Sequence, residues 1–253
     1  MGRGGEAVSE PAGANVRAAK VAVVVGAGPG LGGAVAKRFA RGGYAVALMA
    51  RHADVLTAIE KEIADTGGVA LSVAADASDA SSMAGAFATV RTQLGEPEVL
   101  VYNAGAFQPG GLLEMSVGAF ESAWRSNCFG GFLAAREVLP AMVAKNRGTV
   151  LFTGATASKR GSARFAGLAV GKFGLRALAE SAAREFGPQG IHVAHVVIDG
   201  QIDTPRMRAM MPGRDKSTLL SPDAIAETYW QLHVQDASSW TFELDVRPNT
   251  EKW

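Results

Sequence analysis

Cysteine is almost missing from this sequence, because Cys128 is the only one among 253 residues. An intramolecular disulfide is therefore excluded. A thiolate metal site is not expected either, and we predict no bound metal. A reducing, cytoplasmic setting fits this cysteine content best. Cys128 itself is expected to be a small, buried, hydrophobic side chain.

An excess of charge of either sign is also missing. The 25 Lys and Arg residues nearly balance the 24 Asp and Glu residues, which leaves a formal net charge of +1. Proteins that bind nucleic acid or an anionic membrane surface usually carry a basic face, and this composition does not suggest one. No uninterrupted run of about 18 apolar residues occurs, so no transmembrane helix is predicted. We therefore expect a small-molecule substrate, with no nucleic-acid partner and no membrane partner.

The first residues differ in composition from the rest of the chain. Residues 1–19 are rich in Gly, Ala and small polar residues and lack the apolar run of a signal peptide. They predict a disordered tail, although their Arg and Ala content leaves a role as a targeting segment open. No linker or internal repeat divides residues 20–253, which predicts a single domain.

Short apolar runs alternate with amphipathic segments along this domain. Parallel strands buried on both faces read as such apolar runs, and the intervening segments supply covering helices. The pattern predicts an α/β fold, a doubly wound parallel sheet of the Rossmann type with three αβα layers. Pro140 is expected to kink or divide the long helix that Ser116 caps. The predicted strands are 20–25, 44–50, 69–74, 98–102, 149–153 and 191–198, with 241–246 as a candidate edge strand, and the predicted helices include 53–64, 79–94, 165–186 and one that opens at Ser221-Pro222-Asp223.

A glycine-rich turn follows the first predicted strand. Residues 26–32 read GAGPGLG, and a helix follows in which Leu31, Val35 and Phe39 share one face. Glycines in such a turn let the backbone approach a pyrophosphate, which then lies at the N-terminus of the helix. The turn therefore predicts a dinucleotide site that comprises Gly26, Gly28, Pro29, Gly30, Leu31 and Gly32.

Further motifs follow the later strands. Asp76 comes after the third predicted strand, Asn103-Ala104-Gly105 ends the fourth, and Asn127 and Lys172 lie on two long helices. Together with the glycine spacing, these motifs resemble the classical short-chain dehydrogenase/reductase family over about residues 20 to 205. Val25 stands where that family usually has Thr, and Asp199-Gly200 where it usually has Pro-Gly. The resemblance implies catalytic roles for Asn127 and Lys172, and a nicotinamide cofactor held also by Asp76, Ala77, Asn103, Ala104, Gly105, Lys172, Gly200, Ile202 and Thr204.

The end of the second predicted strand bears on the choice of cofactor. NAD-dependent relatives usually carry an acidic residue there, which binds the 2′-hydroxyl of the ribose. This chain reads LMARH instead, so that Arg51 can pair with a 2′-phosphate and His52 can assist. Arg51 could also be an ordinary solvated residue, but the missing acid argues against NAD on its own. We predict NADP(H), with NAD(H) as the less favoured cofactor.

The catalytic positions are where the resemblance fails. The family uses a Tyr four residues before the Lys and a Ser thirteen residues before that Tyr, for proton transfer and for binding the substrate oxygen. Here these positions hold Leu168 and Ala155. A seven-residue spacing before Lys172 leads to Phe165, and none of the three tyrosines precedes a Lys by four or seven residues. Two of the four usual catalytic groups are therefore missing in this frame.

Other side chains remain as candidates for the proton transfer. Lys172 can act as an acid if burial lowers its pKa. Tyr102, His192 and His195 are expected to be structural, and His233 is expected to face neighbouring side chains or solvent. The loop after the fifth strand offers Thr156, Ser158, Arg160, Ser162 and Arg164, of which Thr156 and Ser158 come closest to replacing the missing Ser.

Three functions are consistent with these residues. The leading hypothesis is an NADP(H)-dependent oxidoreductase with a divergent active site, acting on a carbonyl, an alcohol or an activated double bond. The alternatives are a catalytically weak or silent NADP(H)-binding sensor or partner protein, and a non-redox lyase or isomerase on the same scaffold. A flap over 204–220, with Met207, Met210 and Met211, is expected to border an apolar pocket. Helices around 120–142 and 165–186 are expected to pair in a homodimer or homotetramer.

Overall fold

A seven-stranded sheet forms the centre of the molecule in the computed structural model, which describes residues 20–52 and 54–250. The predicted tail 1–19 lies outside the described residues. Every pairing is parallel and the strand order is β3-β2-β1-β4-β5-β6-β7. The strands are β1 Lys20–Val25, β2 Tyr44–Ala50, β3 Ala70–Ala74, β4 Pro97–Tyr102, β5 Gly148–Ala155, β6 Ile191–Ile198 and β7 Glu243–Val246.

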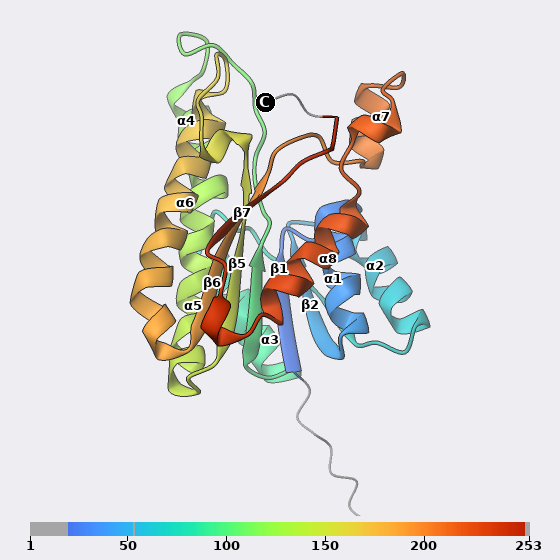
Figure 1. Ribbon diagram of the computed structural model, residues 1–253, viewed down its shortest axis with the longest axis vertical. Helices are drawn as coiled ribbons and strands as arrows, with labels where there is room; N and C mark the ends of the chain where they lie inside the picture. Colours follow the sequence, from blue (N-terminus) through green and yellow to red (C-terminus); the bar gives the residue numbers. More distant parts are fainter. Residues whose placement is uncertain (1–19, 53, 251–253) are drawn as a thin grey trace, which may run out of the picture.

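Helices cover both faces of the sheet, as Figure 1 shows, which gives the predicted three-layer Rossmann-type architecture. One face carries α1, α2 and α8, and the other carries α3, α5 and α6, with α4 leading into α5. The helices are α1 Leu31–Arg41, α2 Asp54–Asp65, α3 Ala80–Gln93, α4 Val117–Trp124, α5 Gly130–Ala144, α6 Ala166–Phe186, α7 Pro205–Met210 and α8 Pro222–His233. In the described residues, no helix is long and apolar enough to cross a membrane.

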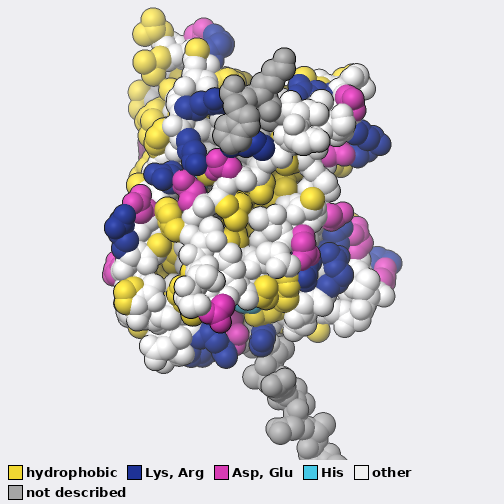
Figure 2. Space-filling model, in the orientation of Figure 1, with side chains coloured by type: hydrophobic (Ala, Val, Ile, Leu, Met, Phe, Trp, Pro, Cys, Tyr) yellow, Lys and Arg dark blue, Asp and Glu magenta, His cyan; other side chains and the backbone are white. Residues whose placement is uncertain are grey.

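Large hydrophobic side chains remain exposed on the outer helices. Figure 2 shows such side chains gathered along the upper left edge of this view, on the side of the molecule where α4 lies. Phe120 and Trp124 of α4 are exposed, and so are Val170 and Phe173 of α6. These two helices also pack against each other.

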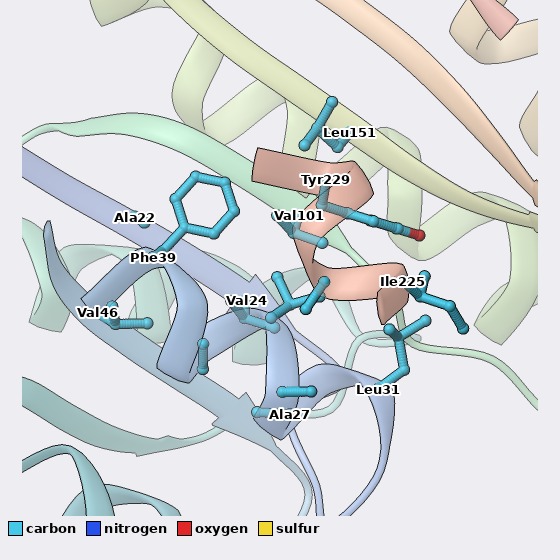
Figure 3. Packing of buried hydrophobic residues seen from close by; sticks show 14 of the residues in the cluster. Ala22, Val24, Ala27, Leu31, Phe39, Val46, Val101, Leu151, Ile225 and Tyr229 are labelled. Carbon is cyan, nitrogen blue, oxygen red and sulfur yellow. The ribbon is translucent and has the colours of Figure 1, made fainter. Parts of the chain in front are cut away.

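The core on the α1 side explains why the apolar runs become strands. Val24 of β1 and Val46 of β2 are fully buried against Phe39 of α1, and Tyr229 and Ile225 of α8 close the layer (Figure 3). Each strand of a parallel sheet covered on both faces must be apolar on both faces, which is why these strands do not alternate. Tyr229 also bonds across this layer, since its hydroxyl lies 2.8 Å from Oγ1 of Thr153.

The long middle helix differs from the prediction. It continues past Pro140 to the end of α5, so Pro140 does not divide it. The irregular turn lies earlier, where residues Arg125–Phe129 form a π-helical turn between α4 and α5. A π turn inserts an extra residue and rotates the side chains that follow it, and such turns occur often at functional sites. Cys128, in this turn, was predicted to be buried, but it is only half-buried.

The predicted flap contains regular structure. Residues Pro205–Met210 form α7, Thr204 caps it, and residues Lys216–Thr218 form a 3₁₀ turn. The two ends of the segment are tied together, because Ile202 and Leu220 form an isolated parallel bridge. Figure 1 shows α7 at the upper right, beyond the carboxyl ends of the strands, the edge at which open α/β sheets bind their ligands.

Candidate functional site

The glycine-rich turn after β1 is closely packed against the loop after β4. Gly26 has a φ of +88°, and a Cβ there would lie 2.4 Å from the backbone nitrogen of Ala104. A Cβ on Gly32 would lie 2.3 Å from the carbonyl oxygen of Gly26. The side chain of Asn103 holds the turn by donating from Nδ2 to that same carbonyl over 2.9 Å. The sequence therefore needs glycine at 26 and 32 to form this turn.

The N-terminus of α1 is open to a ligand. Gly30 caps it without a side-chain hydrogen bond, and the first turn carries no acidic residue. A Cβ on Gly28 would meet nothing within 4 Å, whereas one on Gly30 would lie 2.8 Å from Cγ2 of Thr204. An uncapped, uncharged helix N-terminus beside free space suits a pyrophosphate, and Thr204 forms its opposite wall.

The predicted adenosine-binding residues follow β2 and β3. Arg51 and His52 are exposed after β2, and Asp76 is exposed after β3. Oδ1 of Asp76 accepts hydrogen bonds from the backbone nitrogen and the hydroxyl of Ser78, at 2.9 and 2.7 Å. These bonds lower the pKa of Asp76, and the nearby charge of Arg51 adds to the effect. The adjacent Ala77 is half-buried, and its carbonyl oxygen lies against Gly130 of α5.

Asn127 and Lys172 meet beside Gly105, just beyond β4. A Cβ on Gly105 would lie 2.8 Å from Oδ1 of Asn127 and 3.6 Å from Nζ of Lys172. The π turn holds Asn127 fully buried, and its Nδ2 donates to the carbonyls of Ala106 and Ala123, each over 2.9 Å. Its Oδ1 is buried without a hydrogen-bond partner in the described residues. A buried acceptor of this kind can bind a donor from a ligand or a water molecule.

Lys172 is an unusual side chain, because it is buried without a carboxylate partner in the described residues. Its side chain reaches across from α6, and Nζ donates to the carbonyl oxygen of Thr153 on β5 over 2.7 Å. Burial lowers the pKa of Lys172 to about 8, since desolvation disfavours the charged ammonium. A lysine with such a pKa can give up a proton near neutral pH.

A cavity of about 510 Å³ lies at the carboxyl ends of β5 and β6, and Leu168, four residues before Lys172 on α6, lines it. Ala155 and Leu168, at the two positions where the family's Ser and Tyr are expected, both line it. The two side chains therefore face the same space from β5 and α6, although neither has a hydroxyl. The other lining residues are Phe107, Thr156, Ala157, Arg160, Ser162, Phe165, Ile198, Gly200, Gln201, Ile202, Thr204, Arg206, Met207 and Met210.

The residues after β5 that could replace the missing Ser or Tyr differ in whether they reach the cavity. Thr156, Arg160 and Ser162 line the cavity, but the Thr156 hydroxyl is already bonded to a carboxylate oxygen of Asp199. Ser158 is fully buried and its Oγ accepts from the backbone of Ala155 over 3.1 Å, so it braces the loop instead of facing the cavity. Arg164 is turned away and is held by Glu114 through two hydrogen bonds of 3.0 and 2.8 Å.

The His and Tyr side chains that were expected to be structural are buried or bonded to neighbouring residues. His192 and His195 are buried on β6 and Tyr102 is buried on β4, as predicted, and the Tyr102 hydroxyl donates to the carbonyl of Ser126 over 2.7 Å. His233 is half-buried and faces neighbouring side chains, since its ring nitrogens lie 2.7 Å from the Tyr44 hydroxyl and 2.9 Å from Oγ1 of Thr149. Burial lowers the pKa of His233 to about 4, so the ring is neutral at ordinary pH.

Five cavity residues were not predicted as site residues, and three of them have long side chains with a bearing on the site: Phe107, Gln201 and Arg206. Phe107 comes from the loop after β4, Gln201 from the loop after β6, and Arg206 from α7. Oε1 of Gln201 is buried without a partner in the part of the chain described. Phe107 could have been found from its place just past the Asn-Ala-Gly motif. Arg206 carries no such signal, because its position depends on how α7 folds back over the strands.

Comparison with protein families settles the relationship. The family model described as short chain dehydrogenase matches residues 20–215. The chain belongs to the short-chain dehydrogenase family. Short-chain dehydrogenases bind a nicotinamide cofactor, and the open turn at Gly28, the cavity edge at Thr204 and the orphaned Asn127 acceptor are compatible with one.

Individual short-chain dehydrogenases resemble this chain along most or part of its length. A crystal structure of a short-chain dehydrogenase from Rhodopseudomonas palustris is 38% identical, with a TM-score of 0.79, and covers 92% of this chain and 99% of its own. A metagenomic short-chain oxidoreductase in complex with NADP is 30% identical, with a TM-score of 0.79, over 92% of this chain and 98% of that one. The 2,5-dichloro-2,5-cyclohexadiene-1,4-diol dehydrogenase of Sphingobium indicum is 33% identical over 54% of this chain. The match spans 55% of that relative, so the chain spans about half the length of such curated relatives.

Proposed function

We propose that this protein is an NADP(H)-dependent oxidoreductase that acts on a carbonyl, an alcohol or an activated double bond. The observation that carries the proposal is the convergence of Asn127 and Lys172 beside Gly105, which directly follows the Asn103-Ala104 pair that packs on the glycine-rich turn. A bound nicotinamide would supply hydride transfer to or from the substrate. The cavity would hold that substrate beside it, as expected at the carboxyl ends of a doubly wound sheet.

The choice of NADP(H) over NAD(H) is supported by Arg51. This exposed guanidinium follows β2 directly, where an acidic residue would serve the ribose 2′-hydroxyl of NAD. A guanidinium binds a phosphate through charge-assisted hydrogen bonds, which are stronger than neutral ones. A relative that is 30% identical to this chain was crystallised with NADP, which agrees with this choice.

The active site would work without the usual Tyr and Ser. Leu168 and Ala155 offer the cavity only apolar surface, so neither can donate a proton or bind a substrate oxygen. Lys172 lies on α6 four residues after Leu168, and its pKa of about 8 allows Nζ to hold or release a proton near neutral pH. An activated double bond needs less assistance from a hydroxyl acid than a simple ketone does, and it is therefore the favoured substrate type.

The direct test is to follow the reduced nicotinamide band while NADPH is mixed with a panel of ketones, aldehydes and enones. We expect slow oxidation of NADPH by simple ketones and faster oxidation by at least one enone. Tight NADPH binding without turnover of any panel member would favour the sensor instead. Conversion of a substrate without any change in NADPH would favour a lyase or isomerase.

Restoring the missing hydroxyls tests the assigned frame. The double substitution Leu168→Tyr with Ala155→Ser places two hydroxyl groups on the cavity wall. The new Tyr lies four residues before Lys172 on α6, about one helical turn away. We expect ketone reduction to rise by about 10²–10⁴-fold, the usual contribution of a positioned general acid. Leu168→Phe with Ala155→Ser is the matched control, because it supplies the ring without the hydroxyl. Normal ketone reduction by the unmodified protein would mean that another residue donates the proton.

A further inference from the structure

The walls of the cavity are largely apolar. Aromatic and aliphatic side chains come from four segments: Phe107 after β4, Phe165 before α6, Ile198 at the end of β6, and Met207 with Met210 from α7. Such walls favour an apolar ligand, and flexible Met side chains adapt to its shape. Part of the substrate is therefore expected to be hydrocarbon.

The described side chains that carry a charge in this cavity all have the same sign. Among the lining residues within 20–52 and 54–250, only Arg160 and Arg206 are charged, and none is Asp or Glu. They enter from separate elements, since Arg160 follows the 3₁₀ turn after β5 and Arg206 lies in α7. A cavity with two guanidinium groups and no carboxylate has a positive potential, which low-dielectric walls strengthen.

These two arginines also lack partners that their neighbours have. Within residues 20–52 and 54–250, neither guanidinium forms a hydrogen bond or an ion pair, whereas Arg208 of the same helix is held by Asp203 at 2.5 and 2.6 Å. The carboxylates of a second hollow that Arg160 borders are engaged elsewhere. Asp245 there pairs with Lys159 at 2.9 Å, and Asp199 bonds to Thr156 and lies 3.5 Å from a nitrogen of Arg247.

We propose that the substrate of this cavity is an organic anion, a carboxylate on an apolar body, whose charged end is bound by Arg160 and Arg206. The planar guanidinium suits a carboxylate, because it can present two parallel N–H donors to the two oxygens. The apolar end then lies along Phe107, Phe165 and the Met side chains. This assignment deepens the proposed oxidoreductase function. That the anion is a substrate rests on that function, but the anion site itself can be tested by binding alone.

The test compares each acid with its neutral amide. Isothermal titration on the NADP⁺-loaded protein would use 2-naphthoate against 2-naphthamide, and 4-phenylbutyrate against 4-phenylbutyramide. Each pair has the same apolar body, so any difference reports the charge. We expect the carboxylates to bind about tenfold or more tightly than their amides, in keeping with one charge-assisted contact. The preference should disappear in Arg160→Gln combined with Arg206→Gln.

The control variant is Arg214→Gln, another exposed arginine of the segment after α7, which does not line the cavity and bonds to Thr218 over 2.9 Å. It should keep the full preference for the acids. Equal binding of acid and amide, absence of binding by all four compounds, or a preference that survives the double substitution would each overturn the anion site. A double variant that loses NADP⁺ affinity instead of the preference would also overturn it.

The two proposals can fail separately. If NADP⁺ does not bind, the proposed function fails. The acid preference, measured in the same way on the cofactor-free protein, still decides whether the anion site exists.

Discussion

Arg51 is a single residue whose charge is expected to decide the cofactor. It is exposed directly after β2, beside the carboxylate of Asp76, whose pKa it helps to lower. We expect Arg51→Ala to weaken NADPH binding by about 10–100-fold, because one charge-assisted hydrogen-bonded contact to the 2′-phosphate is lost. NADH binding should change little. Calorimetric titration of both cofactors measures this difference.

The matched control is Arg41→Ala, at the opposite end of α1, about 15 Å from its N-terminus at the helical rise per residue. It removes an equal charge away from the ribose and should leave both affinities unchanged. Tighter binding of NADH than of NADPH by the unmodified protein would contradict the assignment.

Lys172 is expected to make stability depend on pH. Its pKa is lowered to about 8 in the folded protein, from 10.5 in the unfolded chain, so between these values the unfolded chain binds more protons. The free energy of unfolding should therefore rise with pH from about 8 to 10.5 through this group. Below that window, the buried ammonium costs about 3 kcal/mol.

Lys172→Met removes this cost and keeps the volume of the side chain. Without cofactor, we expect the variant to be more stable than the unmodified protein at pH 7, by up to about 3 kcal/mol. The advantage should shrink steadily towards pH 10.5. Urea denaturation of both proteins at several pH values measures it, and the other titrating groups cancel in the difference. An advantage that does not change with pH would show that Lys172 is not desolvated in this way.

Single residues differ in how well the sequence predicts their place. The Asn103-Ala104-Gly105 motif, Asn127 and Lys172 were predicted at this site, and they meet there because each follows a strand or faces the sheet. The partner of His233 could not be predicted, because β2 and β5 supply its contacts from more than 80 residues away. Arg206 could not be predicted either, since a six-residue helix has no fixed orientation without its tertiary contacts.

At the scale of elements, α1 and α8 pack so closely that adding one methyl group at a glycine between them should destabilise the fold. A Cβ on Gly42, after α1, would lie 2.2 Å from Cη2 of Trp230 on α8. That indole also contacts the Arg38 guanidinium, which lies 4.2 Å from its ring centre, and the ring of Phe39, whose centre lies 5.5 Å away. We expect Gly42→Ala to destabilise the fold by about 1–3 kcal/mol through overpacking, measured by urea denaturation.

Gly85→Ala serves as the control within α3. A Cβ there would meet nothing within 4 Å, so this substitution should stabilise by about 0.5–1 kcal/mol through the helix backbone alone. The loss at Gly42 should largely vanish in a Trp230→Ala background. If it persists there, the cause is the local backbone and not the approach of α8.

Elements with a strong local pattern were predicted to within one or two residues. β1, β2 and β6 have the predicted bounds, and Ser221 caps α8 by accepting from Ala224 over 3.4 Å. The π turn at Arg125–Phe129 was missed, because its neighbours on both sides read as one continuous helix. Its cause is tertiary: the turn buries Asn127 against the loop after β4 and against Gly171 of α6.

At the scale of the whole molecule, the exposed face of α4 and α6 is expected to pair with a second copy of the chain. Trp124 of α4 and Phe173 of α6 remain 36% and 44% exposed. We expect a dimer or tetramer at micromolar concentration, and a shift to monomer in Phe173→Glu, because pairing would bury the new charge. Light scattering measures the mass of both.

Val55→Glu on α2 is the control, since Val55 is 43% exposed but lies on the opposite face of the sheet. It should leave the assembly intact. A monomeric mass for the unmodified protein would refute the pairing.

The central place of β1 has a consequence for synthesis of the chain on the ribosome. β1 comes first in the chain among the seven described strands, yet it pairs with β2 on one edge and with β4 on the other. The run KVAVVV therefore keeps one hydrogen-bonding edge open until residues Pro97–Tyr102 have emerged. At translation rates of about 5–20 residues per second, that interval is on the order of 4–15 s. During it, an apolar strand with a free edge is a target for aggregation, and chaperone binding is expected to concentrate on this early segment of the nascent chain.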